Sequence, residues 1–370
     1  MSEPPRTVHQ FLPSFSDRDA IGSHTLEIQR LLRSFGWRSE IYSEDLHPEV
    51  RSAGKPVDAL VTEALDRSVA LLYHASTGCR NFDRLLGWKG PLLVDYHNIT
   101  EPAFFERWSP GASDNMRLAR TQLADLAARC DAAIAHSGFS AAELSDLGYP
   151  KPAVAPVIVD IARFQRQTDR RTLARLERAK AGGGASWLYV GRVAPNKCHH
   201  DLIGAFAAYR ALFDPQARLA LVGGATAESY WDALESLTRE LELRASVEFT
   251  DTIPDAALLA YYRSADVFVS MSEHEGFGVP LLEAMHFGIP VVAYAAAAVP
   301  ETVGNGGVLL DTKDPVAVAV AVKRVLEGDL RSRLVAAGAA RVAELSLTRS
   351  RERYATAVRA ALESAARPHG

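Results

Sequence analysis

Two glutamates flank a glycine-broken loop within residues 270–294, SMSEHEGFGVPLLEAMHFGIPVVAY. The apolar run before the loop predicts a buried strand. Pro280 suits the first turn of a following helix, because its missing N–H would be unpaired there anyway. The helix start would then expose backbone N–H groups beside the positive end of a helix dipole. This arrangement binds anions, and a nucleotide diphosphate is the most common biological anion of that kind.

Glu275 and Glu283 add acceptor-only groups to this predicted anion site. Carboxylates do not neutralise a phosphate, so their presence is best explained by hydroxyl groups that they bind. A molecule that combines phosphate with many hydroxyls is a sugar nucleotide. The alternative is that both glutamates are solvated charges on an ordinary strand-loop-helix unit, and their spacing alone does not decide between the two.

The string E-G-F-G-V-P-L-L-E, with A-M and G-I-P-V-V following, resembles the E-x7-E signature of the retaining glycosyltransferases of family 4. The resemblance implies that Glu275 contacts hydroxyls of the transferred sugar and that Glu283 binds the ribose of the donor. It also implies that the backbone of the loop and of the helix start holds the sugar and the phosphate. The positions concerned here are Gly276, Phe277, Gly278, Val279 and Leu281.

The segment WLYVGRVAPNK places Arg192 and Lys197 five residues apart after a predicted strand. Two such cations can neutralise a diphosphate, although a pair of surface cations is the alternative. The string resembles the G-R-x-x-x-x-K of the same family, in which both cations bind the donor diphosphate. Cys198 stands where glycine usually follows the lysine, and so near the predicted site it could be reactive. His199 and His200 are expected to be structural or at the surface, since we recognise no partner at metal-ligand spacing.

The first half of the chain offers further candidates. His97 follows the predicted strand LLVDY, and doubly wound sheets place functional residues beyond the carboxyl ends of their strands. It resembles the active-site histidine of the family and would hold a sugar hydroxyl or a main-chain carbonyl. Gly22 and Ser23, just before a predicted amphipathic helix, resemble the family's loop that approaches the donor; a plain turn and cap is the alternative. His74 and Ser137 are weaker candidates.

Composition limits the class of protein. A length of 370 residues suggests two domains, and a content of 48% hydrophobic and 23% charged residues is ordinary for a globular protein. The net charge of -4 speaks against a nucleic-acid partner. The three scattered cysteines suit a reducing compartment, and no apolar run approaches the roughly 18 residues of a spanning helix. We expect a cytoplasmic protein with at most peripheral contact with the inner face of the membrane; its oligomeric state stays open.

Apolar strand-like runs alternate with helical stretches along both halves of the chain, which predicts parallel sheets covered on both faces. We therefore predict an α/β fold with two doubly wound, Rossmann-like domains. The resemblance implies the GT-B architecture, in which the two domains face each other across a cleft. The predicted domains are 1–165 for the acceptor, 166–345 for the nucleotide sugar, and 346–370 as a helix that crosses back to the first domain. The predicted strands are 7–11, 69–73, 92–96, 132–135, 154–159, 187–190, 219–222, 247–249, 267–270, 291–294 and 308–310.

A nicotinamide-dependent dehydrogenase is the first rival, but the sequence lacks its G-x-G-x-x-G fingerprint between a strand and a helix. A sugar-nucleotide epimerase, another enzyme of GT-B architecture and a non-enzymatic sugar-nucleotide-binding protein remain alternatives.

The sequence thus predicts a hexosyltransferase of polysaccharide-biosynthesis type, acting from GDP-mannose or a UDP-hexose on a saccharide, a lipid-linked saccharide or a small metabolite. The resemblance assigns Glu275 to sugar hydroxyls, so no obvious nucleophile remains for a covalent route, and front-face substitution is favoured. His97, Glu275, Arg192 and Lys197 would then act by electrostatic stabilisation. We expect neither a metal nor a cofactor, because the two fixed cations would replace Mg²⁺. The D-x-D letters at 17–19 are discounted, since they precede the first predicted helix.

Overall fold

The computed structural model describes residues 6–16, 19–60, 68–161 and 167–365. The chain divides into two compact units. Unit 1 comprises Met1–Ala103, Gly111–Val159 and Ser346–Gly370, and unit 2 comprises Phe104–Pro110 and Asp160–Leu345. Each unit is built on a parallel sheet with helices on its faces, which confirms the predicted α/β class of two doubly wound domains.

In the described residues, unit 1 contains a seven-stranded sheet in the order β3-β2-β1-β4-β5-β6-β7, with parallel neighbours throughout. Its strands are β1 (Thr7–Phe15), β2 (Ile41–Leu46), β3 (Gly54–Pro56), β4 (Val69–Ala75), β5 (Leu92–Tyr96), β6 (Ala132–Ala135) and β7 (Ala153–Val154). Its helices are α1 (Ala20–Ser34), α2 (Phe82–Leu86), α3 (Pro110–Leu126), α4 (Gly138–Asp146) and α13 (Leu347–Ala365), with the short η1 (Pro48–Val50), η2 (Val57–Leu60) and η3 (Pro102–Phe104).

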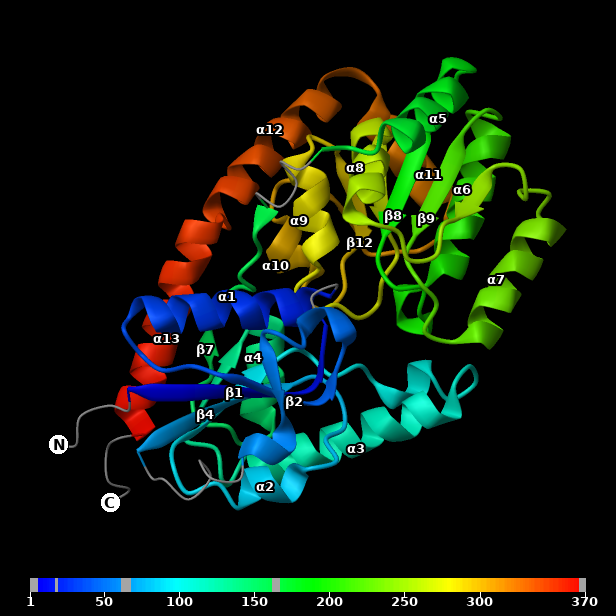
Figure 1. Cartoon of the computed structure of the whole chain (residues 1–370). Helices are drawn as coiled ribbons and strands as arrows, with labels where there is room; N and C mark the ends of the chain where they lie inside the picture. The colour runs from blue at the N-terminus through cyan, green and yellow to red at the C-terminus, as the bar shows by residue number, and fades with distance from the viewer. Residues whose placement is uncertain (1–5, 17–18, 61–67, 162–166, 366–370) are drawn as a thin grey trace. The chain divides into compact units, whose positions relative to one another are not determined.

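Two groups of helices cover the two faces of this sheet. Ile28 and Leu32 of α1 and Val358 of α13 pack with Leu72 and Leu93 of the strands on one face. The helices α2, α3 and α4 cover the other face through a second apolar cluster (Figure 1). The sheet is therefore buried on both sides, as continuous apolar strand runs require.

Among the described residues, unit 2 contains a six-stranded parallel sheet in the order β10-β9-β8-β11-β12-β13. Its strands are β8 (Ser186–Val190), β9 (Arg218–Val222), β10 (Val247–Phe249), β11 (Val267–Ser270), β12 (Val291–Tyr294) and β13 (Gly307–Leu310). Its helices are α5 (Arg170–Ala181), α6 (His199–Leu212), α7 (Glu228–Glu240), α8 (Asp255–Ser264), α9 (Val279–His286), α10 (Val299–Val303), α11 (Pro315–Leu326) and α12 (Gly328–Glu344), with the short η5 (Pro195–Lys197).

The strand order of unit 2 reverses between β8 and β11, which are neighbours in the sheet although three strands apart in the order of the chain. Such a switch point is where open α/β sheets bind ligands, beyond the carboxyl ends of the strands. Trp187 and Phe206 lie in the apolar cluster that α6, α7 and α11 form with one face of the sheet. This packing fixes the strand ends from which the candidate site is built.

Most predicted strands are confirmed, and the exceptions have local causes. Strands β2 and β3 were missed because IYSEDL is not a continuous apolar run and β3 is a three-residue edge strand that contains Pro56. The predicted strand 154–159 is wrong beyond Val154, where Pro156 lacks the N–H that a continued ladder needs. Within the described ranges, the structure contains no helix of the length and apolarity that crossing a membrane requires.

Candidate active site

Helix α9 begins at the loop that the sequence singled out. Its N-cap is Gly278, in the left-handed conformation with φ 86°, and a Cβ there would lie 2.8 Å from Cδ1 of Leu281. Glycine is therefore required both by the backbone and by the space. Since Gly278 brings no side-chain acceptor, the first-turn N–H groups of α9 are not capped by it and stay suited to an anion.

The loop before α9 is tied to the predicted cation motif. Nζ of Lys197 lies 2.7 Å from Oε1 of Glu275 and donates a 3.0 Å hydrogen bond to the carbonyl of His274. The two charged side chains are 17% and 16% exposed. The structure thus brings two of the predicted residues into one ion pair at the switch point between β8 and β11.

Arg192 lies two residues after the end of β8, and it is exposed. It lies on the same strand-to-loop connection as Lys197, which ends η5. Both cations therefore stand beyond the carboxyl end of β8, as their spacing predicted. The exposed guanidinium of Arg192 and the amine of Lys197, which already pairs with a carboxylate, could bind the negative charges of a diphosphate.

Cys198 occupies the position at which the resemblance expects glycine, and its backbone adopts the left-handed conformation with φ 52° and ψ 46°. This conformation favours glycine, so the turn forms despite the substitution. The expected reactivity of the thiol is wrong: Cys198 is buried, and burial raises its pKa to about 11.

A second set of charged residues adjoins this loop. Nζ of Lys313 lies 2.6 Å from Oδ2 of Asp201 and also binds Glu273. Burial opposes the charge of Lys313, but hydrogen bonds to the two carboxylates outweigh it and raise the pKa of the amine. Sequence reasoning missed this network, because nothing local connects residue 313 to residues 201 and 273.

The two histidines after Cys198 differ in environment. His199 is fully buried against the ring of Tyr189, and burial lowers its pKa to about 3. His200 is half exposed, with Nδ1 2.9 Å from the hydroxyl of Tyr230. Cys198, His200 and Asp201 do lie close together, contrary to our expectation that no partner stands at ligand spacing, although Asp201 already binds Lys313.

Glu283 of α9 is only 2% exposed. Its Oε2 accepts a 2.6 Å hydrogen bond from the hydroxyl of Tyr262, whose ring stacks on Phe287 at 5.0 Å. The carboxylate is thus held rigidly inside unit 2, and its assignment to the ribose of a donor stays a prediction.

In unit 1 the position of the predicted glycine loop needs correction. Helix α1 begins at Ala20 and Asp19 is its N-cap, accepting a 2.7 Å hydrogen bond from the N–H of Gly22. Gly22 and Ser23 therefore lie in the first turn of the helix and not before it. A Cβ at Gly22 would lie 1.5 Å from the carbonyl oxygen of Ser16, so close backbone approach explains this glycine. Of the D-x-D letters, only Asp19 lies in the described residues.

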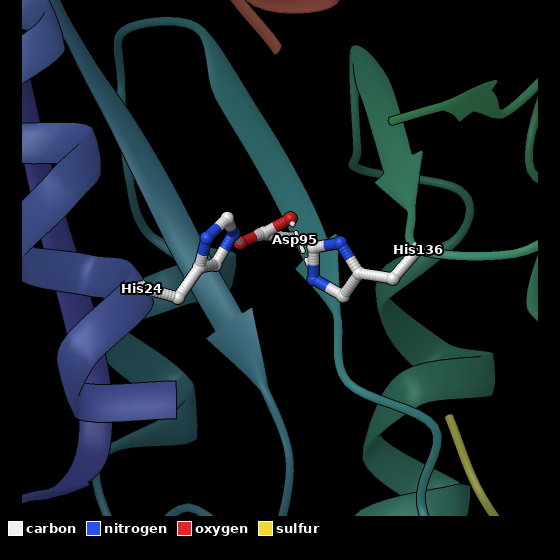
Figure 2. Close-up of side chains that lie close together, drawn as sticks. All are labelled: His24, Asp95 and His136. Carbon is white, nitrogen blue, oxygen red and sulfur yellow. Dashed lines mark ion pairs between the residues drawn. The ribbon is translucent and has the colours of Figure 1, made fainter. Parts of the chain in front are cut away.

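His97 is not isolated. Its Nε2 lies 3.0 Å from Nδ1 of His74 and 3.4 Å from Oδ2 of Asp95, and the His74 ring stacks on it at 5.2 Å. Asp95 of β5 is fully buried, and its Oδ2 lies 3.1 Å from Nδ1 of His74. It also contacts His24 and His136 (Figure 2). The weaker candidate His74 thus lies beside the stronger one, and Asp95, His24 and His136 were missed.

Burial and mutual contact shift these groups. Burial lowers the pKa of His74 to about 4 and that of His136 to about 3. Burial works against the charge of Asp95, yet the surrounding histidines hold its pKa well below the usual value. We call His24, His74, Asp95, His97 and His136 the Asp95 cluster. The lowered pKa values of His74 and His136 keep these two rings neutral at pH 7.

Ser137 has a structural role in the described fold. It is the N-cap of α4, and its Oγ accepts a 3.1 Å hydrogen bond from the N–H of Ser140. Such a contact satisfies one of the unpaired donors of the helix start.

Residues 172–341 match the family model described as "Glycosyl transferases group 1". The chain carries a glycosyl transferases group 1 domain. This domain contains the E-x7-E stretch and both predicted cations, so the predicted resemblance to glycosyltransferases is confirmed, while family 4 and a retaining reaction stay predictions.

Curated relatives of the group 1 domain support this assignment. A D-inositol 3-phosphate glycosyltransferase of Geodermatophilus obscurus is 35% identical over 225 residues, which is 58% of this chain and 49% of the relative. A GDP-mannose-dependent alpha-(1-6)-phosphatidylinositol monomannoside mannosyltransferase of Mycolicibacterium smegmatis is 31% identical over 226 residues, 58% of each chain. The chain spans about half the length of the curated relatives it matches.

Solved structures resemble nearly the whole chain, including the group 1 domain. HepE of Anabaena in complex with UDP-glucose has a TM-score of 0.72 at 20% identity and covers 95% of this chain and 99% of its own. The sucrose-phosphate synthase of Thermosynechococcus elongatus has a TM-score of 0.74 at 19% identity, with 97% and 100% covered. The likeness confirms the predicted GT-B fold class.

Proposed function

We propose that this protein is a retaining, metal-independent glycosyltransferase that moves a hexosyl group from a nucleotide-diphosphate sugar to a hydroxyl group of an acceptor. The observation that carries the proposal is the pairing of Lys197 with Glu275 at the switch point of unit 2, beside the amino end of α9. A cation for the diphosphate and an acceptor for sugar hydroxyls are thereby held in one place. Exposed Arg192 adds the second cation.

The proposed reaction is a substitution on one face of the sugar. The acceptor oxygen bonds to the anomeric carbon while the bond from that carbon to the diphosphate oxygen breaks, and the acceptor's proton passes to the departing oxygen. Arg192, Lys197 and the first-turn N–H groups of α9 would stabilise the charge that develops on the diphosphate. Glu275, oriented by Lys197, would accept hydrogen bonds from hydroxyls of the transferred sugar.

Other predicted residues take supporting roles in this proposal. The backbone of the α9 loop, from Gly276 to Leu281, would line the sugar and the phosphate, and Glu283 would bind the ribose. The first turn of α1, with Gly22 and Ser23, would approach the donor. His97 would hold a sugar hydroxyl.

GDP-mannose or a UDP-hexose is the donor that we propose. One relative is named for its dependence on GDP-mannose, and a structural neighbour was solved with UDP-glucose. The acceptor would be a saccharide, a lipid-linked saccharide or a small metabolite, in the cytoplasm or at the inner face of the membrane.

Thermal stabilisation by UDP-, GDP-, ADP- and dTDP-sugars, measured with and without a chelator, tests this proposal. One nucleotide should raise the melting temperature in both conditions, because a ligand stabilises the state that binds it. Arg192→Ala should lose the shift and Glu283→Gln should weaken it. Arg244→Ala, which removes another exposed arginine of unit 2, should keep it. A wild-type protein that responds to no nucleotide sugar, or only in the presence of a metal, would contradict the proposal.

A further inference from the structure

A pocket of about 400 Å³ lies between helix α5 and the sheet of unit 2. It is at the amino end of the sheet, where the first residues of β8 and β9, Ser186 and Arg218, line it. Arg192 and Lys197 lie beyond the opposite, carboxyl end of β8. This strand has five residues, which separate its two ends by about 13 Å. The pocket is therefore distinct from the candidate active site of the same unit.

The floor of the pocket is a partly exposed stretch of the sheet face. Leu188 of β8 pairs with Ala220 of β9, and Ala220 pairs with Glu248 of β10, so these three residues share one face. Ala220 and Glu248 are only half-buried, although β9 lies between two other strands. Trp187 and Leu219 pack in the apolar cluster on the opposite face. The small side chain of Ala220 thus leaves a hollow in the floor, which a larger side chain would fill.

One wall of the pocket is held by an ion pair and two hydrogen bonds. Nη2 of Arg175 in α5 lies 2.8 Å from Oε1 of Glu248 and 2.6 Å from the hydroxyl of Tyr261 in α8. The hydroxyl of Tyr261 donates a 2.8 Å hydrogen bond to the same carboxylate oxygen. These contacts tie α5 to both β10 and α8. The pocket is therefore preformed, as small-molecule sites usually are.

Two further arginines line the pocket, and neither pairs with a carboxylate among the residues that the structure describes. Nη1 of Arg218 donates a 3.0 Å hydrogen bond to the carbonyl of Gly183, which is a neutral group. Arg244 lies in the connection from α7 to β10 and is exposed. A guanidinium binds phosphate oxygens through two parallel, charge-assisted hydrogen bonds. The pocket is thereby suited to a phosphate group.

Hydroxyl groups flank Arg218 on both sides. Ser186 pairs with Arg218 in the register of β8 and β9, and the carbonyl of Ser246 accepts a 2.8 Å hydrogen bond from the N–H of Leu219. Both serines line the pocket and are half-buried. The carboxylate of Glu248 opposes a ligand that is negatively charged throughout, but it can accept hydrogen bonds from hydroxyls. The lining thus favours a ligand that combines one phosphate with several hydroxyls.

We propose that this pocket is a second ligand site of unit 2, for a phosphate monoester of a hydroxylated compound such as a sugar phosphate. The phosphate would contact the guanidinium groups of Arg218 and Arg244. The hydroxylated body would lie over Leu188 and Ala220, with hydroxyls directed towards Glu248. The volume of the pocket is in the range of small-molecule sites. The inference does not depend on the proposed transfer reaction, because none of these residues belongs to the switch point.

Isothermal titration calorimetry of the full chain with glucose 6-phosphate tests this site. Glucose 6-phosphate should bind, glucose should not, and inorganic phosphate should bind more weakly because it lacks the hydroxylated body. Arg244→Gln should weaken the binding about tenfold or more, as expected for the loss of charge-assisted hydrogen bonds. Arg239→Gln is the matched control, because it removes an exposed arginine of α7 that does not line the pocket, and it should leave the affinity unchanged.

Ala220→Ile tests the floor without changing a charge. Isoleucine is well suited to a strand, and its larger side chain would occupy the hollow. Binding of glucose 6-phosphate should be lost, whereas the melting temperature should not fall, which shows that the variant is folded. Arg192→Ala, at the other end of the sheet, should keep the binding.

Three results would overturn the inference. The first is a wild-type protein that does not bind glucose 6-phosphate at millimolar concentration. The second is binding that is lost in Arg192→Ala but kept in Arg244→Gln and Ala220→Ile, which would place the phosphate at the switch point. The third is equal affinity for inorganic phosphate, which would contradict recognition of a hydroxylated body. A protein that binds glucose 6-phosphate but no nucleotide sugar would instead refute the proposed function and leave this inference standing.

Discussion

The carboxyl edges of the two sheets carry opposite kinds of chemistry on the same strand order. In unit 2 the edge presents an exposed arginine, a partly exposed lysine–glutamate pair and a helix start without a side-chain cap. In unit 1 the edge holds a carboxylate and histidines that are almost fully buried. The first arrangement leaves charge available to a ligand, whereas the second keeps a carboxylate inside the fold among histidine rings. The comparison shows that the carboxyl edge of a parallel sheet can either offer charged groups to a ligand or bury them.

The largest effect is expected from a substitution at the buried carboxyl edge of the unit 1 sheet. Asp95→Ala removes the buried carboxylate that His24, His74 and His97 face, so we expect a loss of about 3–5 kcal/mol in the free energy of unfolding. Urea denaturation measures it. Asp131→Ala is the control: its partly exposed carboxylate accepts a 2.8 Å hydrogen bond from the N–H of Leu92 and one of 3.4 Å from Arg129, and its loss should cost about 1 kcal/mol. Equal costs for the two variants would show that the cluster is not a special support of unit 1.

The next effect is expected at the carboxyl edge of the unit 2 sheet. A substitution there should change binding and turnover rather than stability. Lys197→Met removes the cation that orients Glu275, and we expect turnover with the responsive nucleotide sugar to fall about 10²–10³-fold. Nucleotide release measures this rate. Lys180→Met is the matched control, because Lys180 also pairs with a carboxylate, at 2.6 Å from Asp266, but near the opposite end of the same sheet. A comparable loss of turnover in both variants would mean that position at the switch point does not matter.

The two edges also differ in how well the sequence predicted them. The residues of unit 2 lie in two short motifs, so 192, 197 and 275–283 could be found by reading along the chain. The Asp95 cluster draws a single residue from each of several distant segments, and only the sheet brings them together. A signal was nevertheless present: the polar residues His74, Asp95 and His136 each follow an apolar residue two positions earlier in a predicted strand. Without the strand order this pattern does not show that they meet.

Local features limited the fold prediction in a different way. Strands with an apolar run of three residues, such as β5 and β11, were found with their observed bounds. The polar strand β2 gave no such run, and its place is fixed by pairing with β1. The helix start at Ala20 was placed too late, because glycine and serine also occur in turns while the actual cap is Asp19.

Acid should weaken unit 1 more than unit 2. The unfolded pKa of histidine is about 6.5, whereas His74 titrates at about 4 and His136 at about 3 in the fold, so below pH 6.5 the unfolded chain binds protons that the folded chain does not. Stability is therefore lost as pH falls, by about 2 kcal/mol for each of these histidines between pH 7 and 5. In unit 2 the histidine with the most strongly lowered pKa is His199. Hydrogen exchange, corrected for its intrinsic pH dependence, should show unit 1 opening first.

One variant tests whether the histidines of the Asp95 cluster cause this pH dependence. His136→Asn keeps a donor for the carbonyl of Ala155 but cannot take up a proton, so it should flatten the loss of protection in unit 1. His47→Asn removes an exposed histidine and should not. An unchanged slope in His136→Asn would contradict the assignment of the acid sensitivity to the cluster.

The smallest effect compares one buried cysteine from each unit. Cys198 in unit 2 has a left-handed backbone, whereas Cys130 in unit 1 does not. At Cys198, alanine keeps the Cβ that strains this conformation and loses the sulfur, so Cys198→Gly should be more stable than Cys198→Ala by up to about 1 kcal/mol. At Cys130 the order should reverse by a similar amount, since glycine there only increases the entropy of the unfolded chain. Thermal denaturation of the four variants measures both orders. If alanine were the better replacement at both positions, the left-handed turn that carries Lys197 would not need a glycine-like residue, and the resemblance of this motif would rest on its cations alone.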